Sequence, residues 1–249
     1  MILFLLLTWV TGTAEASRPP LDPPGKILFI GDSHSVGTFG HTLDGLLRER
    51  YGDETVYNYA SCGSRTSSWI TGRSTRCGYI DRRPGGATRR ARNHRTPRID
   101  VLLDDVNPRI TIVALGANHM GQRQESFIES VQTLAQSIRD HGSECVWVGP
   151  PPGRVPHRDH GLNRSEIQEL LPAVLVDFCT FIESSLYVSY PRHGGDGVHF
   201  DSIRPGGRAL ARHWAEGIYA AARPFLDQAS FGYANLSEPL LQPEIFTEP

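Results

Sequence analysis

The segment from Lys26 to Ser35 constrains the fold of this chain more than any other stretch. Four consecutive apolar residues, Ile27 to Ile30, run directly into Gly31-Asp32-Ser33. A short apolar run of this kind predicts a buried parallel strand, and the tripeptide predicts a sharp turn with a serine at its tip. In an open α/β sheet, ligands and catalytic groups gather at the carboxyl ends of strands. Ser33 is therefore a candidate nucleophile, and the alternative is that Gly-Asp-Ser forms only a turn.

Apolar strands and amphipathic helices alternate along the chain that follows. This alternation predicts a parallel sheet of about five strands covered on both faces, which is a three-layer α/β/α domain. The chain of 249 residues is long enough to bury the core of one such domain, which we place at residues 26–225. The predicted strands are 26–30, 55–59, 110–115, 144–148 and 186–190, and the predicted helices are 39–50, 99–106, 125–140, 166–182 and 205–222.

The two ends of the chain have a different character. Residues 1–10 are almost wholly apolar, and Ala14-Glu15-Ala16 has the small-x-small pattern of a signal-peptide cleavage site. A membrane anchor is the alternative, but the run is shorter than the roughly 20 apolar residues that span a bilayer. We therefore expect a signal peptide at 1–16, a proline-rich linker at 17–25, a C-terminal tail at 226–249, and a secreted or periplasmic protein without a membrane span after cleavage.

Four cysteines lie in the expected mature chain. An even number of cysteines in an exported protein predicts two disulfides, and four cysteines allow three connectivities. Of these we expect the pairing of sequence neighbours, Cys62 with Cys77 and Cys145 with Cys179. No C-x-x-C spacing occurs, so no zinc site is predicted.

Residues 65–98 differ from the rest of the chain in charge. Ten arginines in this segment face a single acidic residue, Asp81, and no helical or strand period is visible. The composition predicts a loop insertion, which is either a solvated surface loop or a cationic patch for an anionic polymer such as an acidic polysaccharide. Nucleic acid would fit the charge, but aromatic residues for base stacking are sparse and export argues against it.

Three loops that follow predicted strands carry side chains suited to acyl transfer. A serine nucleophile needs a base, a group that orients the base, and donors for the oxyanion. His199 can be the base for Ser33, and Asp196 can hold the other ring nitrogen. The backbone N–H groups of Ser33 and Gly63, with the side-chain amide of Asn118, can form the oxyanion hole.

Four short blocks of the sequence resemble a known family. Gly31-Asp32-Ser33, Gly63, Gly116-Ala117-Asn118 and Asp196-Gly197-Val198-His199 stand in the order and rough spacing of the SGNH or GDSL hydrolases. The resemblance covers the chain from Lys26 to about Ala222. It implies a flavodoxin-like three-layer fold and ester hydrolysis with no metal and no other cofactor. It also implies the same roles for Ser33, His199, Asp196, Gly63 and Asn118 as the chemistry above.

Two histidines beside these blocks depart from the common pattern. His119 follows Asn118, where many members carry aspartate, and His34 directly follows Ser33. Gly-Asp-Ser-His is similar to the opening block of bacterial cell-wall O-acetylesterases, which points to O-acetyl polysaccharides. We take His34 and His119 as candidate substrate-binding residues. The alternative for His34 is a histidine packed into the first helical turn.

Three functions fit these observations. The first is an exported serine esterase that hydrolyses small acyl esters, with O-acetyl groups on a polysaccharide or cell-wall glycan as the expected substrate. The second is an O-acyltransferase that uses the same site with a sugar acceptor in place of water. The third is a non-catalytic glycan-binding protein, which the presence of all the required side chains disfavours.

Overall fold

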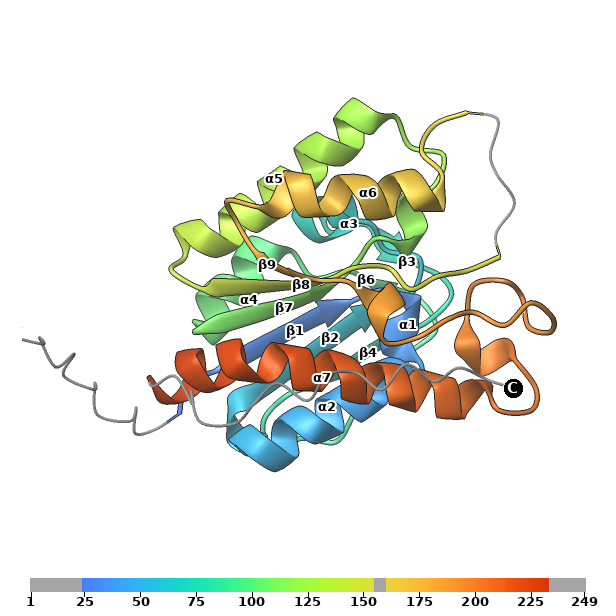
Figure 1. Cartoon of the computed structure of the whole chain (residues 1–249). Coiled ribbons are helices and arrows are strands. Elements are labelled where there is room, and N and C mark those ends of the chain that lie inside the picture. The colour runs from blue at the N-terminus through green and yellow to red at the C-terminus, as the bar shows by residue number, and fades with distance from the viewer. Residues whose placement is uncertain (1–23, 155–159, 233–249) are drawn as a thin grey trace, which may run out of the picture.

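The computed structural model describes residues 24–154 and 160–232, in which a seven-stranded sheet lies between two layers of helices (Figure 1). The expected signal peptide, most of the linker and the chain beyond residue 232 lie outside the described residues. The strand order is β5-β4-β2-β1-β7-β8-β9. The five strands from β2 to β9 are parallel, whereas β4 and β5 are antiparallel to their neighbours. The strands are β1 (Ile27–Gly31), β2 (Val56–Ser61), β4 (Tyr79–Arg82), β5 (Arg89–Ala91), β7 (Ile110–Ala114), β8 (Glu144–Val148) and β9 (Thr180–Ile182).

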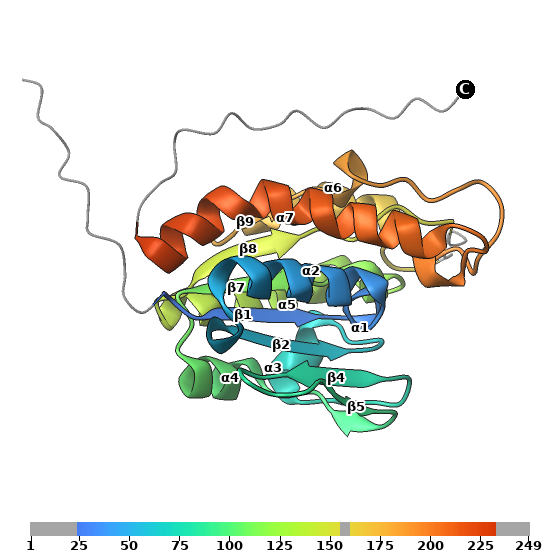
Figure 2. The same cartoon turned by 90° about the horizontal axis from the view of Figure 1, so that it is seen from below.

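Helices cover both faces of this sheet, so the predicted three-layer α/β/α class is confirmed (Figures 1 and 2). The β1 strand is buried at every position and divides the core. Ile27 and Phe29 point to the face covered by α2 and α7, and Leu28 and Ile30 point to the face covered by α3 to α6. The helices are α1 (Ser33–Val36), α2 (Thr38–Tyr51), α3 (Thr66–Thr71), α4 (Ile99–Val106), α5 (Gln124–Asp140), α6 (Arg164–Leu175) and α7 (Gly207–Phe231).

The register of the parallel strands brings three loops to one edge of the sheet. Gly31, the last residue of β1, lies opposite Ala60 in β2 and Ala114 in β7. The segments that follow these strands therefore begin side by side. They are the segments that carry Gly-Asp-Ser, Gly63 and Asn118.

The last parallel strand differs from its predicted position. The helix predicted at 166–182 ends at Leu175, and β9 is Thr180–Ile182 rather than the predicted 186–190. The Cys145–Cys179 disulfide joins the chain before β9 to β8, so the polypeptide returns to the sheet soon after the helix ends. In the segment predicted as a strand, Val188 is buried but Leu186 is 62% exposed.

The arginine-rich segment 65–98 is folded, so its prediction as an irregular loop insertion is wrong. It contains α3, the sheet strands β4 and β5, and a second small sheet of β3 (Ser74–Thr75) and β6 (His94–Arg95). Tyr79 and Ile80 in β4 are buried, and Tyr79 pairs with Ser61 of β2. The strand period is hidden in the sequence because these strands are only two to four residues long and polar residues occupy most of their positions.

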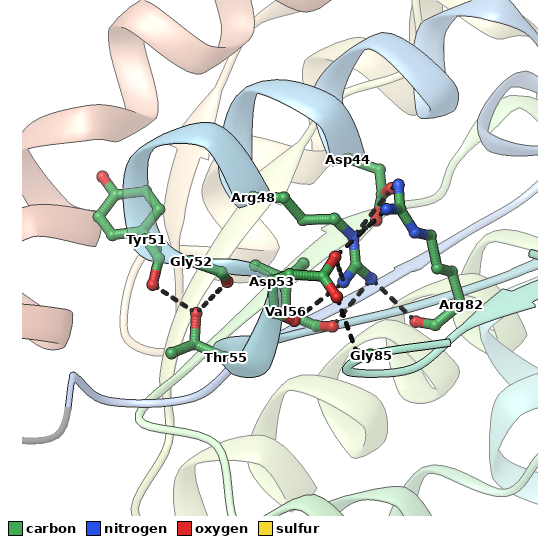
Figure 3. A network of polar contacts seen from close by, with 9 residues as sticks. All are labelled: Asp44, Arg48, Tyr51, Gly52, Asp53, Thr55, Val56, Arg82 and Gly85. Carbon is green, nitrogen blue, oxygen red and sulfur yellow. Dashed lines mark hydrogen bonds and ion pairs between the residues drawn. The ribbon is translucent and has the colours of Figure 1, made fainter. Parts of the chain in front are cut away.

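Arg48 in α2 attaches this segment to the domain through a polar network (Figure 3). Its buried guanidinium donates to Asp44 at 3.0 Å, to Asp53 at 2.8 Å, and to the backbone carbonyls of Val56 and Arg82. The Arg82 side chain also pairs with Asp44, at 2.9 Å, and with Asp53, at 3.2 Å. Helix α2, the start of β2 and the end of β4 are thus held together by one group of charges.

The closing helix is longer than the sequence pattern indicated. It runs to Phe231 rather than ending near Ala222, so residues 226–231 of the predicted tail are helical. Asp227 lies buried in this extra part and accepts a hydrogen bond from the Tyr51 hydroxyl at 2.8 Å. Its other oxygen pairs with Arg50 at 3.2 Å. These contacts between α2 and α7 keep the last turns of the helix on the core.

Both disulfides form between the cysteines expected from the sequence. Cys62–Cys77 ties the loop after β2 to the chain that enters β4. Two disulfides fit a protein of an oxidising compartment. None of the helices within residues 24–154 and 160–232 has the length and apolar character to cross a membrane.

Removing the Cys62–Cys77 disulfide with the double substitution Cys62→Ala and Cys77→Ala is expected to lower the free energy of unfolding. The bond closes a loop with a sequence separation of 15 residues. Cross-linking such a loop contributes about 3 kcal/mol by restricting the unfolded chain. Urea unfolding followed by far-UV circular dichroism measures the change, and an unchanged midpoint would contradict it.

Candidate active site

Ser33, His199 and Asp196 lie in a hydrogen-bonded series at the carboxyl edge of the sheet. Ser33 is the first residue of α1, and Asp32 alone separates it from the end of β1. Its Oγ is 2.9 Å from Nε2 of His199, and Nδ1 of the same ring is 2.7 Å from Oδ2 of Asp196. The structure therefore brings together three side chains that stand 166 and three residues apart in the sequence. Hydroxyl, imidazole and carboxylate in this order suit nucleophilic catalysis.

The carboxylate of Asp196 is held in its ionised form. Burial acts to raise its pKa, but hydrogen bonds from the His199 side chain and from backbone N–H groups outweigh burial and lower the pKa. The donors are the N–H groups of His199, at 2.7 Å, and Val198, at 2.9 Å. An ionised Asp196 accepts the proton on Nδ1 of His199. The lone pair of Nε2 then faces Ser33, as a general base requires.

Several residues that sequence reasoning missed hold the histidine loop in place. Asp201 accepts hydrogen bonds from the backbone N–H of Thr38, at 2.9 Å, and from its hydroxyl, at 2.5 Å. This contact fastens the loop to the first turn of α2. The Tyr190 hydroxyl accepts from the N–H of Gly197 at 3.0 Å, and Gly197 has φ of 84°. Asp201 stands two residues after His199, which is the one sequence signal that it had.

The predicted oxyanion donors lie on the loops after β1, β2 and β7. Among the described residues, the backbone N–H groups of Ser33 and Gly63 have no hydrogen-bond acceptor. Gly63 has φ of 72°, a left-handed conformation that favours glycine. The Asn118 amide nitrogen donates to Asp32 Oδ2, at 3.3 Å, and to the Ser64 carbonyl, at 3.1 Å. The contact with Asp32 is longer than an ordinary N–H···O hydrogen bond, so an oxyanion can compete for this donor.

Arg65 connects two of these loops. Its Nε donates to the backbone carbonyl of Asn118 at 2.5 Å, and its backbone N–H donates to Ser68. The sequence interpretation counted Arg65 with the cationic insertion and missed this role. The contact fixes the separation between the loop of Gly63 and the loop of Asn118.

Asp32 is a buried acid beside the nucleophile. Burial raises its pKa to about 6, although the backbone hydrogen bond from His34 and the charges of His199 and Arg164 act to lower it. Its Oδ1 accepts the His34 N–H at 3.0 Å, and its Oδ2 accepts from Asn118. Asp32 therefore links the loop after β1 to the loop after β7, and it does not contact the His199 ring through a hydrogen bond.

Arg164 places a buried positive charge near Asp32. Its Nη1 donates to the carbonyl of Pro151 at 2.7 Å, while Nε and Nη2 are buried without a partner among the described residues. Burial lowers the pKa of Arg164 and the charge of Asp32 opposes that effect. No local pattern marks Arg164 as a buried residue, because it stands at the first position of α6.

Replacing Asp32 by asparagine is expected to make stability less dependent on pH. The folded-state pKa of Asp32 lies above its unfolded value of 3.8, so this group stabilises the fold below pH 3.8 and loses that contribution as pH rises through about 6. The ionised group then costs about 3 kcal/mol at pH 8. The difference in unfolding free energy between Asp32→Asn and the parent should therefore favour the variant more at pH 8 than at pH 4. Equal differences at the two pH values would contradict this prediction.

His119 is not placed to bind substrate, which corrects the sequence prediction. Its side chain is fully buried, and burial lowers its pKa to about 4. Nε2 accepts the backbone N–H of Thr66 at 3.3 Å, and Nδ1 lies 2.8 Å from Oε1 of Gln122. Both nitrogens are used in joining the start of α3 to the loop after β7.

His34 is also buried, so the structure favours the packed alternative over substrate binding. Its ring meets the Trp214 ring edge-on at 5.4 Å and lies 5.3 Å from the His199 ring, measured between centroids. Burial lowers the pKa of His34 to about 3, with smaller contributions from the charges of His199 and Arg164. His34 is thus an uncharged ring packed beside His199, so it does not repel a positive charge on the His199 ring.

No protein-family model and no curated protein matches the sequence. Solved structures match the fold. A candidate acylhydrolase from Bacteroides fragilis is 12% identical over 85% of this chain and 92% of its own, with a TM-score of 0.57. The psychrotrophic esterase EstA from Pseudoalteromonas sp. is 15% identical over 82% of this chain and 99% of its own, with a TM-score of 0.51. A GDSL-like lipase from Bacteroides thetaiotaomicron is 12% identical over 81% of this chain and 92% of its own, with a TM-score of 0.50.

These likenesses extend over most of both chains, and their low identities make them a statement about the fold. The chain therefore has the fold of the SGNH or GDSL hydrolases.

Proposed function

We propose that this chain is an exported serine esterase that hydrolyses short acyl esters through an acyl-enzyme on Ser33. The observation that carries the proposal is the unbroken series of hydrogen bonds from Asp196 through His199 to Ser33. The fold supports it, because acylhydrolases, esterases and lipases are among its structural neighbours. The two disulfides and the apolar N-terminal segment support export.

The reaction begins when Ser33 Oγ attacks the carbonyl carbon of the ester and His199 Nε2 takes the hydroxyl proton. The N–H groups of Ser33, Gly63 and Asn118 donate to the oxyanion of the tetrahedral intermediate. When the bond to the alcohol breaks, protonated His199 gives its proton to the leaving oxygen. Water then attacks the acyl-enzyme by the same steps in reverse roles, which releases the acid and restores Ser33.

The substrate class that we propose is O-acetyl groups on a glycan. The side chains of His199 and Asp196 are 40% and 47% exposed, so the site is open to solvent on the side of the base. An open site suits an ester carried on a polymer. The Gly-Asp-Ser-His block adds its similarity to cell-wall O-acetylesterases.

A panel of esters tests this function. We expect p-nitrophenyl acetate to be hydrolysed faster than the butyrate and octanoate esters, and acetate to be released from an acetylated polysaccharide. Faster hydrolysis of the octanoate would contradict the short-acyl assignment. Release of p-nitrophenol that requires an added acceptor sugar, with the acetyl group recovered on that sugar instead of as free acetate, would favour the acyltransferase alternative. The Ser33→Ala variant provides the background rate.

A further inference from the structure

A groove of about 340 Å³ lies between α4 and the strands β4, β5 and β6. No residue of the Ser33 site lines it. Its described lining residues include four arginines, Arg83, Arg89, Arg95 and Arg98, but only one acidic side chain, Asp105. The volume falls in the range of small-molecule binding sites. The groove is therefore a concave site with a large excess of positive charge.

Aromatic rings hold two of these arginines. The guanidinium of Arg83 lies 5.9 Å from the ring centroid of Tyr59, and that of Arg89 lies 6.0 Å from the ring of Tyr79. His94 stacks on Tyr79 with centroids 3.9 Å apart. An arginine that already rests on an aromatic face loses less conformational freedom when it binds a ligand.

Two of the four groove arginines form ion pairs within the described part of the chain, and two do not. Arg89 and Arg98 form ion pairs with aspartates. Arg83 and Arg95 form no ion pair with an acidic side chain of the described residues. Arg95 donates its Nε to the carbonyl of Gly72 at 2.8 Å, so its two Nη groups are the donors for a carboxylate or sulfate. Arg83 can bind such a group through two parallel hydrogen bonds.

We propose that this groove binds an acidic sugar residue of a polysaccharide, with its anionic group on Arg83 and Arg95. Nucleic acid fits less well, because Tyr59 and Tyr79 are only 3% and 1% exposed and offer no open face for base stacking. A membrane surface also fits less well. Val101 is the one large apolar side chain of the described lining that is exposed, so there is no apolar patch to enter a bilayer.

One end of the groove, at Tyr79, lies near the carboxyl edge of the sheet, whereas Arg83 follows the far end of β4, where Arg82 pairs with Asn58. Tyr79 pairs with Ser61, which stands two residues before Gly63. Strand β4 is two strands from β1, a lateral separation of about 10 Å. A polysaccharide that extends past the Tyr79 end of the groove can therefore carry a further residue toward Ser33. This catalytic consequence rests on the proposed esterase function, whereas binding in the groove does not.

Calorimetric titration of the full chain with a short oligogalacturonate tests the proposal. The Ser33→Ala variant is used so that binding is measured without turnover, and a neutral galacto-oligosaccharide of equal length is the control ligand. We expect the acidic ligand alone to bind. The double substitution Arg83→Met and Arg95→Met should weaken its binding at least tenfold, because charge-assisted hydrogen bonds are lost while the aliphatic stems remain. Arg208→Met with Arg212→Met, two exposed arginines of α7, removes the same charge elsewhere and should leave binding unchanged.

Several results would overturn the proposal. These are equal binding of the neutral ligand, equal losses in the two double variants, or tighter binding of a single-stranded oligonucleotide or of anionic vesicles. Circular dichroism checks that each variant is folded, and Arg83→Lys adds a variant that keeps the charge but loses the planar fork. Hydrolysis of p-nitrophenyl acetate by the groove variants reports separately on the esterase. If the groove variants hydrolyse the ester normally but no longer bind oligogalacturonate, the groove proposal is supported. If the chain with Ser33 intact binds oligogalacturonate but does not hydrolyse the ester, only the esterase proposal is contradicted.

Discussion

Replacing Ser33 by alanine is expected to lower the turnover of p-nitrophenyl acetate by about a million-fold. Nucleophile, base and orienting carboxylate act as a unit, so removing the serine alone costs about as much as removing all three. The expected loss follows from the contact between Ser33 Oγ and His199 Nε2. Among the described residues, no other hydroxyl lies at hydrogen-bond distance from this nitrogen and could replace Ser33. Steady-state kinetics measure the loss, and labelling with a fluorophosphonate should mark Ser33 in the parent chain and nothing in the variant.

Ser35 supplies a matched control for this experiment. It lies two residues away in the same short helix, and its buried hydroxyl has no hydrogen-bond partner among the described residues. Ser35→Ala should therefore remain folded and active. A variant at Ser33 that keeps its activity, or a variant at Ser35 that loses activity to the same degree while folded, would show that Ser33 is not the nucleophile.

Replacing Arg48 by methionine is expected to lower the free energy of unfolding by about 3–5 kcal/mol. Breaking a buried ion pair by removing one partner leaves uncompensated charge and carbonyl groups in the interior. Here the substitution removes the hydrogen bonds that Arg48 donates to Asp44, to Asp53 and to the Val56 carbonyl (Figure 3). Urea unfolding at neutral pH, with both disulfides oxidised, measures the change.

Two further variants show whether the loss comes from the network. Glu49→Gln changes an exposed charge on the next residue of α2 and should shift stability by no more than about 0.5 kcal/mol. The double substitution Asp44→Leu and Arg48→Met should cost less than the two single changes added together, because the pair interacts directly. Additive losses would mean that the direct pair between Asp44 and Arg48 contributes no stability of its own.

The central strands and the candidate triad were predictable because each is marked locally in the sequence. The apolar run of β1 can be read from residues 27–30, and Asp196 stands three residues before His199. Parallel pairing then brings loop ends to one edge whatever the details of the helices. Ser33, Gly63 and Asn118 could therefore be placed near one another before the structure was known.

The remaining features depend on partners that are distant in the sequence. Arg82 appeared to belong to an irregular cationic loop because its partner Asp44 lies 38 residues earlier. His119 appeared available to substrate because its burial comes from packing of α3 against the loop after β7, which no local pattern records. The end of α7 was underestimated for the same reason, since Asp227 reads as a surface residue until Tyr51 is placed beside it.

The position of β5 at the outer edge of the sheet has a consequence for how copies of the chain meet. Arg89 and Arg90 form most of this three-residue strand, and both are exposed. Two molecules that approached edge to edge would bring these arginines against one another, and like charges across paired strands are unfavourable. The cationic edge strand therefore protects the protein from extending its sheet into an aggregate.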